Sequence, residues 1–146
     1  MDTEGLLRSL KEHRVDFVVI GATAFPVHGY ARATLDIDIF IRPDSANAER
    51  TWQALKGFGY DMSDVSVDDL LAKKLLIRQY TVEVDVHPFV SGVTFDEVWR
   101  RKVKARYGRV TAYFASLDDL IKMKRAAGRA KDREDLSCLL RLKKRS

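Results

Sequence analysis

Asp36 and Asp38, two aspartates separated by one residue, are the side chains of this sequence best suited to chemistry. They lie in LDIDIFI, residues 35–41, where acidic and apolar residues alternate as in a β-strand. Both carboxylates would then project to one side, about 6.5–7 Å apart along the chain. Carboxylates at that distance repel, and a hard divalent cation such as Mg²⁺ relieves the repulsion. The pattern predicts a metal site, although a solvent-facing amphipathic edge strand would show the same alternation.

A third carboxylate, Asp85, lies in a second alternating segment. In TVEVDVHPF, residues 81–89, valines alternate with polar side chains, so one face of a strand would carry Glu83, Asp85 and His87. Asp85 is the expected third oxygen ligand, and Glu83 is its competitor. Three acidic groups from adjacent strands can hold two cations, which supports in-line phosphoryl or nucleotidyl transfer. His87 precedes a proline and is interpreted as a structural residue or a substrate contact rather than a metal ligand.

A glycine-led turn precedes the aspartates. The apolar run VDFVVIG ends at Gly21 and is typical of a strand buried on both faces, and residues 22–30 indicate a short helix or helical turn with Pro26 in its first turn. A helix N-terminus offers free backbone N–H groups to a phosphate, and a glycine permits close approach of the backbone. A phosphate-binding turn and a carboxylate pair are therefore expected within residues 21–40.

The other elements are expected to position these groups in an α/β (α+β) fold, with a mixed β-sheet flanked by helices and a C-terminal helix pair. Helices are expected at residues 3–13, 44–56, 117–128 and 131–142, and a short helix or turn at residues 93–101. Strands are expected at 15–21, 35–41 and 108–115, and 73–89 is expected to form a hairpin that turns near 79–81. The 146 residues suit one domain over 1–146, with a core at about 15–115 and C-terminal helices at about 116–144. Gly57 is the expected stop of the helix that begins after Asp44.

Lys124 lies on the apolar stripe of the helix expected from residue 117. A lysine on a buried face needs a compensating group. A triphosphate, a carboxylate of the next helix (Asp132 or Asp135), or water reached by an extended side chain would each serve. We keep all three alternatives open at this point.

Charge is distributed unevenly along the chain. Residues 1–99 carry a net charge of −6 and residues 100–146 a net charge of +11. The basic third predicts a polyanionic partner such as a nucleoside triphosphate or nucleic acid, or else solvated helix faces with a basic tail. The single Cys138 excludes an internal disulfide and a cysteine-based metal cluster. Since the sequence shows neither a membrane span nor a signal-peptide pattern, a cytoplasmic location without membrane association is expected.

Two separated motifs carry a family resemblance. Gly21-Ala22, thirteen further residues and Asp36-Ile37-Asp38 together resemble the signature of the nucleotidyltransferase superfamily with the DNA polymerase beta-like fold. The stretches HGYARATLDIDI and SLDDLIKMKRAAGRAKDREDL are similar to small bacterial nucleotidyltransferase-like proteins, including the abortive-infection type used in toxin–antitoxin systems. The resemblance spans roughly residues 15–136.

The resemblance implies roles for particular residues. Asp36, Asp38 and Asp85 would bind Mg²⁺ or Mn²⁺, and Asp85 would also be the base for an acceptor hydroxyl. Nucleotide and phosphate contacts would come from Gly21, Ala22, Thr23, Arg32, Thr34 and Lys124. For Arg32 and Thr34, a local turn network is an equal alternative. Ala22 stands where the superfamily usually has glycine or serine, so Thr23 or backbone N–H groups would have to replace a serine hydroxyl.

The expected function is metal-dependent transfer of a nucleoside monophosphate from an NTP, such as ATP, to an acceptor hydroxyl with release of pyrophosphate. The acceptor would be a protein, an RNA such as tRNA, or a small molecule. The alternative is a catalytically inactive nucleotide-binding or interaction module, for instance one component of a toxin–antitoxin system with a second protein. Ala22 is the feature that favours this alternative.

Overall fold

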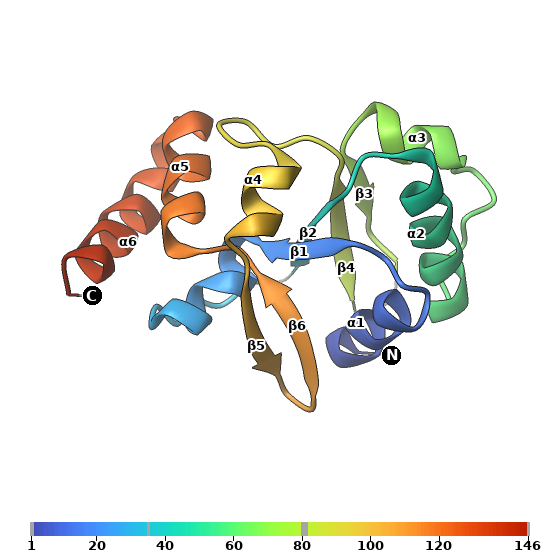
Figure 1. Ribbon diagram of the computed structural model, residues 1–146, viewed down its shortest axis with the longest axis horizontal. Coiled ribbons are helices and arrows are strands. Elements are labelled where there is room, and N and C mark those ends of the chain that lie inside the picture. The colour runs from blue at the N-terminus through green and yellow to red at the C-terminus, as the bar shows by residue number, and fades with distance from the viewer. Residues whose placement is uncertain (1, 35, 80–81, 146) are drawn as a thin grey trace.

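The computed structural model describes residues 2–34, 36–79 and 82–145 (Figure 1). Its strands form a six-stranded mixed sheet in the order β3-β4-β2-β1-β6-β5. The strands are β1 (Phe17–Ile20), β2 (Asp36–Ile41), β3 (Leu75–Ile77), β4 (Glu83–His87), β5 (Val103–Tyr107) and β6 (Val110–Phe114). The α-helices are α1 (Thr3–Glu12), α2 (Ser45–Phe58), α3 (Val67–Ala72), α4 (Phe95–Arg100), α5 (Leu117–Ala127) and α6 (Arg133–Arg145). Two 3₁₀ segments are η1 (Gly21–His28) and η2 (Ala130–Asp132).

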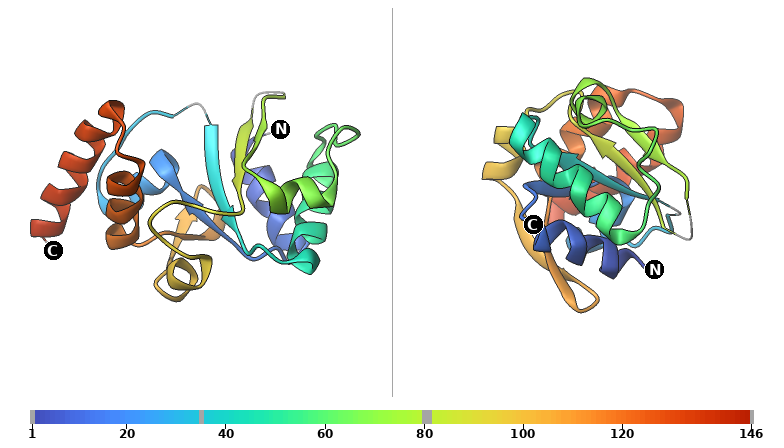
Figure 2. Two further views of the ribbon diagram at one scale, coloured as in Figure 1. Left: turned by 90° about the horizontal axis from the view of Figure 1, so that it is seen from above. Right: turned by 90° about the vertical axis from the view of Figure 1, so that its right-hand side faces the viewer.

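The predicted α+β fold with a mixed sheet is confirmed. β1 and β2 lie at the centre of the sheet, and all four residues of β1 are buried, as its continuous apolar run predicts. β1 pairs antiparallel with β2 and parallel with β6, whereas β2 pairs parallel with β4. The helices α1, α2 and α3 gather on one side of the molecule, and the α5–α6 pair lies on the other (Figures 1 and 2). The sheet centre between these groups holds the residues of chemical interest.

The alternation predicted for β2 and β4 is confirmed. Ile37, Ile39 and Ile41 are buried, while Asp36 and Asp38 are partly exposed on the other face. The residues 73–89 form the antiparallel pair β3–β4. The turn predicted near 79–81 lies partly outside the described residues, and so does Leu35 at the start of the predicted strand 35–41.

Two predictions about helix ends were wrong. Gly57 does not end α2, because Gly59 takes the positive φ of +124° and its N–H bonds to the carbonyls of Leu55 and Lys56. A Cβ placed on Gly57 would instead lie 3.2 Å from Cε1 of the His13 ring. Pro26 is not in the first turn of its helix, but near the end of η1. The 3₁₀ geometry of η1 accommodates it, because the clash of a proline ring with a carbonyl four residues back belongs to the α-helix.

Two elements were missing from the predicted order. The helix α3 has six residues, too few for a helical period to stand out, and a capping box between Ser66 and Asp69 starts it. The strand β5 forms an antiparallel hairpin with β6 and carries exposed Lys104 and Arg106. Among the described residues, no helix combines the length and apolar character that a bilayer span requires. The division into one domain over 1–146 stays a prediction.

Candidate active site

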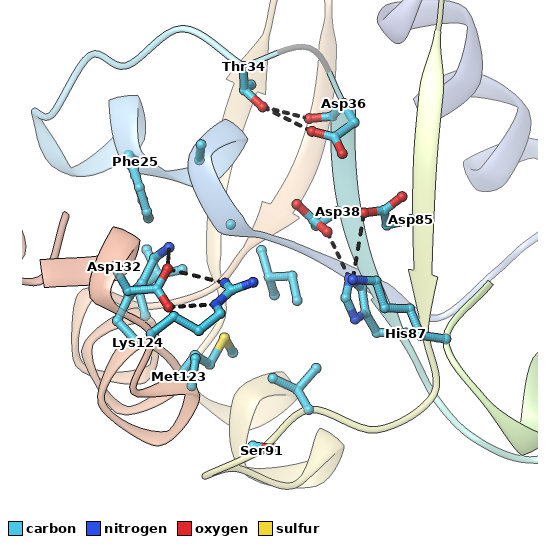
Figure 3. Close-up of a pocket in the computed structure, with 18 of the residues that line it drawn as sticks. Phe25, Thr34, Asp36, Asp38, Asp85, His87, Ser91, Met123, Lys124 and Asp132 are labelled. Atoms are coloured by element: carbon cyan, nitrogen blue, oxygen red, sulfur yellow. Dashed lines mark hydrogen bonds and ion pairs between the residues drawn. The ribbon is translucent and has the colours of Figure 1, made fainter. Parts of the chain in front are cut away.

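A cavity of about 610 Å³ opens where β1 ends and where β2 and β4 begin (Figure 3). This end of the sheet combines the three strands because β2 runs antiparallel to β1 and parallel to β4. Residues of η1, of the loop after β4 and of α5 complete the walls. The cavity therefore collects side chains from segments that lie far apart in the sequence.

The carboxylates gather on one wall of this cavity because of the strand register. Asp38 pairs with Asp85 in the parallel ladder of β2 and β4, and Asp36 pairs with Glu83. Paired residues share a face of the sheet. Asp36, Asp38 and Asp85 line the cavity, whereas Glu83 is not among the described residues that do. The register thus brings all three predicted carboxylates to one cavity.

A candidate metal-ligand set lies on this wall. One ligand atom each from Asp38, Asp85 and His87 lie within 4.8 Å of one another. His87 Nε2 is 2.8 Å from Asp38 Oδ1, and the Asp85 side chain is only 7% exposed. Two carboxylates and an imidazole are a donor set that divalent cations accept, so these residues fit a metal site. Asp36 lies outside this set.

Sequence reasoning interpreted His87 as a structural residue or substrate contact, and the structure places it in the candidate ligand set instead. The signal was present in the sequence, since His87 follows Asp85 by two residues on an alternating strand. The proline that follows His87 does not pull the side chain away, because β4 continues to His87 and ends there.

Asp36 is held at the mouth of the cavity by other groups. Thr34 Oγ1 donates to the backbone carbonyl of Asp36 at 2.9 Å and to its Oδ1 at 3.3 Å. Thr34 lines the cavity, so it combines the local turn network with access to a ligand. The phosphate contact predicted for Thr34 stays a prediction.

Arg78 is a cavity residue that sequence reasoning missed. Its guanidinium lies 2.5 Å from Asp85 Oδ1, and 3.4 Å from both Asp36 Oδ2 and Glu83 Oε2. The hydrogen bond to Asp85, followed by the charges of the three carboxylates, raises the pKa of Arg78 despite partial desolvation. Lys74 adds a more distant cation, 3.9 Å from Asp85 Oδ2. The acidic wall therefore carries its own counter-charges.

The glycine-led turn borders the carboxylates directly. Gly21 has a φ of +68° and starts η1, whose first turn has no side-chain cap. Gly21 and Ala22 line the cavity. Thr23 is not among the described lining residues, and its Oγ1 lies 3.5 Å from the carbonyl of Asp36. The structure thus brings Gly21 and Ala22 to the cavity, but it does not bring Thr23 there.

Lys124 lies on the opposite wall (Figure 3). Its Nζ is 2.9 Å from Asp132 Oδ1 and 3.2 Å from Asp135 Oδ2, and its side chain is 17% exposed. The carboxylate partners considered for this lysine are therefore both present. Because Lys124 also lines the cavity, pairing with these aspartates leaves it within reach of a ligand.

Asp132 anchors the cationic wall. Burial alone would raise its pKa, but hydrogen bonds from Arg129 and Lys124 lower the pKa of Asp132 to about 2. Arg129 Nε lies 2.7 Å from Asp132 Oδ2 and also lines the cavity. One buried carboxylate thus holds two cations side by side at the cavity edge.

Asp135 ties the loop before β2 to α6. Arg32 Nε lies 3.0 Å from Asp135 Oδ1, and the Tyr30 hydroxyl donates to the same oxygen at 3.0 Å. Burial, and then the hydrogen bond to Asp135, raises the pKa of Tyr30 to about 12. Arg32 lines the cavity, so this loop brings a further cation to the mouth.

The remaining wall is apolar. Val90, Leu120, Met123 and Ala127 line the cavity, and Phe89 lies at its rim with 65% of its surface exposed. Gly92 fixes the loop that carries Phe89 against α5, because a Cβ at Gly92 would come within 2.7 Å of Ala126 Cβ. The cavity therefore has an acidic, a cationic and an apolar part.

The similarity of the chain to known proteins identifies its family. No curated protein matches the chain. Over residues 2–146 the chain matches the family described as nucleotidyl transferase of unknown function (DUF2204). This match includes the sheet, the cavity and both C-terminal helices. The chain therefore belongs to this nucleotidyl transferase family.

Proposed function

We propose that the protein transfers a nucleoside monophosphate from an NTP, such as ATP, to an acceptor hydroxyl and releases pyrophosphate. The observation that carries this proposal is the opposition of two walls across one cavity. Asp38, Asp85 and His87 face the cavity on one side, and Lys124 and Asp132 lie on the other (Figure 3). Arg129 pairs with Asp132 and also lines the cavity. Such a cavity suits a substrate that carries both a cation and a row of phosphates. The family match supports this reaction class.

The acidic wall would hold Mg²⁺ or Mn²⁺ through Asp38, Asp85 and His87, with Asp36 beside them. When bound, such a cation neutralises phosphate charge and favours ionisation of the attacking hydroxyl. Asp85 then accepts the proton of the acceptor hydroxyl at one of its carboxylate oxygens. A new bond forms between the acceptor oxygen and the α-phosphorus, and the bond from this phosphorus to the β-phosphate oxygen breaks. The β- and γ-phosphates leave together as pyrophosphate.

The other walls bind and orient the nucleotide. The backbone N–H groups that follow Gly21 would bind phosphate oxygens, since Ala22 has no hydroxyl to contribute. Lys124, Arg129 and Arg32 compensate the charge of the triphosphate and of the leaving pyrophosphate. The apolar part beside Phe89 and Met123 would receive the nucleobase.

The reaction is tested with α-labelled NTPs, Mg²⁺ or Mn²⁺, and a cell extract as the source of protein, RNA and small-molecule acceptors. We expect label transfer by the unmodified protein and at least about a hundredfold loss when both Asp36 and Asp38 are alanine. Asp96→Ala is the matched control, because Asp96 is an exposed aspartate that pairs only with Arg42 among the described residues. If the unmodified protein transfers no label and calorimetry detects no NTP binding to it, the proposed function is wrong.

A catalytically inactive nucleotide-binding or interaction module is the second candidate function. It is favoured by Ala22, which stands where the superfamily usually has glycine or serine and offers no hydroxyl, and by the Arg78 guanidinium that already compensates the carboxylates. A module of this kind would bind NTP in the cavity without transferring label. A second protein of a toxin–antitoxin pair, and a cytoplasmic location, stay predictions.

A further inference from the structure

Arg78 is placed by its backbone rather than by chance contacts of a long side chain. The preceding residue, Ile77, pairs with Val84 in the β3–β4 ladder. The side-chain amide of the following residue, Gln79, accepts from the Asp61 N–H at 2.7 Å and donates to the Asp61 carbonyl at 3.1 Å. The chain is therefore fixed on both sides of Arg78, and this directs the side chain toward the acidic wall.

The Arg78 guanidinium serves three carboxylates at once. It donates to Asp85 Oδ1 at 2.5 Å, and it lies 3.4 Å from oxygens of Asp36 and Glu83. Asp85 is 7% exposed, whereas Arg78 is 42% exposed. A buried carboxylate needs a positive partner, but the half-exposed guanidinium can leave for water at a small energetic penalty.

A divalent cation and the Arg78 guanidinium would bind the same carboxylate oxygens. Asp85 belongs to the candidate metal-ligand set, and Asp36 lies beside it. Arginine keeps its charge at all ordinary pH values, so it cannot make room for another cation by losing a proton. Two cations at one carboxylate pair repel each other at short range. Binding of one therefore weakens binding of the other.

We propose that Arg78 is a built-in counter-ion that competes with the divalent cation for Asp85 and Asp36. In the metal-free protein it compensates the buried Asp85, and it releases the carboxylates when the cation binds. Since Arg78 itself lines the cavity, the released guanidinium remains close to the space that phosphates would occupy. This inference rests on the proposed function for the identity of the cation and the nucleotide.

The competition has a consequence for the order of binding. A cation alone has to displace Arg78 from Asp85 and Asp36, which leaves the guanidinium only the Glu83 carboxylate among the three. A cation that arrives with a triphosphate brings a further partner, because the phosphates can accept the released guanidinium. Binding of the cation and the nucleotide is thus coupled, and Arg78 carries the coupling.

The direct test measures Mn²⁺ binding without nucleotide, through the electron paramagnetic resonance signal of free Mn²⁺. We expect Arg78→Ala to bind Mn²⁺ about tenfold more tightly than the unmodified protein, because a contacting competitor is gone. Lys74→Ala is the matched control, since it removes the same charge near Asp85 at 3.9 Å without contacting Asp36. It should change Mn²⁺ affinity by no more than about threefold.

Thermal unfolding distinguishes displacement of Arg78 by the cation from a general effect of removing one positive charge. Thermal unfolding should show that Arg78→Ala lowers Tm without metal, because Asp85 loses its main partner, and that Mn²⁺ raises the Tm of this variant more than that of the unmodified protein. Arg78→Gln keeps a hydrogen-bond donor and serves if the alanine variant does not fold. With nucleotide and Mn²⁺ together, the coupling between them should be weaker in either variant.

The outcomes distinguish the inference from the proposed function. Equal or weaker Mn²⁺ binding by both Arg78 variants, or an equal gain in Lys74→Ala, would overturn the competition while leaving metal-dependent transfer intact. If neither the unmodified protein nor the variants bind Mn²⁺, the competition and the metal-dependent reaction are both wrong. Label transfer measured on the same preparations reports the proposed function separately.

Discussion

The Cα of Gly21 lies directly against the carboxylate of Asp38. A Cβ placed on Gly21 would come within 2.7 Å of Asp38 Oδ2, closer than a Cβ atom approaches a non-bonded atom in proteins. The contact follows from the sheet register, in which Ile20 pairs with Asp38 across β1 and β2. The turn proposed to bind phosphate and the candidate metal ligand therefore share one surface, with no side chain between them.

Gly21→Ala should weaken Mn²⁺ binding by at least about tenfold and lower the free energy of unfolding by about 1–3 kcal/mol. The new methyl group displaces Asp38, and the φ of +68° strains any residue other than glycine. Gly29→Ala is the matched control, with a φ of +100° but, among the described residues, only Leu142 near the new Cβ, at 3.6 Å. Chemical unfolding of both variants measures the change in stability, and Mn²⁺ titration measures the change in affinity. An equal loss of Mn²⁺ affinity in Gly29→Ala would show that the effect is backbone strain alone.

Lys124→Met should reduce NTP affinity at least about tenfold, because it removes a cation from the wall that faces the carboxylates. Some stability should also be lost, about 1–3 kcal/mol, since Asp132 and Asp135 keep Arg129 and Arg32 but lose their shared partner. Lys122→Met controls for the helix, because Lys122 is exposed on the same α5. Calorimetry with NTP measures the effect, and unchanged affinity would remove Lys124 from the proposed site.

Acid should destabilise the protein partly through Asp132. Its pKa of about 2 lies below the ordinary value of 3.8, so its stabilising contribution is complete above about pH 4 and is lost as the pH falls through 2. The contribution is on the order of 2 kcal/mol. Asp132→Asn should therefore be less stable than the unmodified protein at pH 7, and the difference should shrink toward pH 2. Urea unfolding across this range provides the measurement, and a constant difference would contradict the assignment.

Phe89→Ala should weaken NTP binding about tenfold while leaving inorganic tripolyphosphate binding unchanged, since stacking involves the base alone. Leu76→Ala is the control, because Leu76 is also an exposed apolar residue, at 52%, but is not among the described residues that line the cavity. Calorimetry with NTP and with tripolyphosphate, on the unmodified protein and both variants, gives the affinities to be compared. Equal losses for both ligands would place the base elsewhere.

The faces of the strands could be predicted from the sequence, because a period of two is a local property. Asp36 and Asp38 on one face of β2, and Asp85 on one face of β4, follow from alternation alone. That Asp38 lies opposite Asp85 could not be predicted, because register depends on how three strands of different direction pair. The approach of both segments to one cavity is thus a tertiary result.

Arg78 shows why part of the site was missed. Its contact with Asp36 spans 42 residues of sequence and has no local signature. An arginine after a short strand is usually a solvated side chain, and only the pairing of β3 with β4 directs this one toward the carboxylates. The short elements α3 and β5 were not predicted for a related reason, since a segment of about five or six residues shows too little periodicity to be recognised.

The hydrogen bond from Tyr30 to Asp135 also affects the order in which parts of the protein fold during synthesis. These residues are 105 positions apart, so the loop before β2 leaves the ribosome long before its anchor on α6. At about 5–20 residues per second, the delay is about 5–20 s. The central sheet can assemble in that interval, whereas Asp135 can join Arg32 and Tyr30 only once α6 has docked. Nascent chains therefore carry the carboxylates before α6 has completed the proposed nucleotide site.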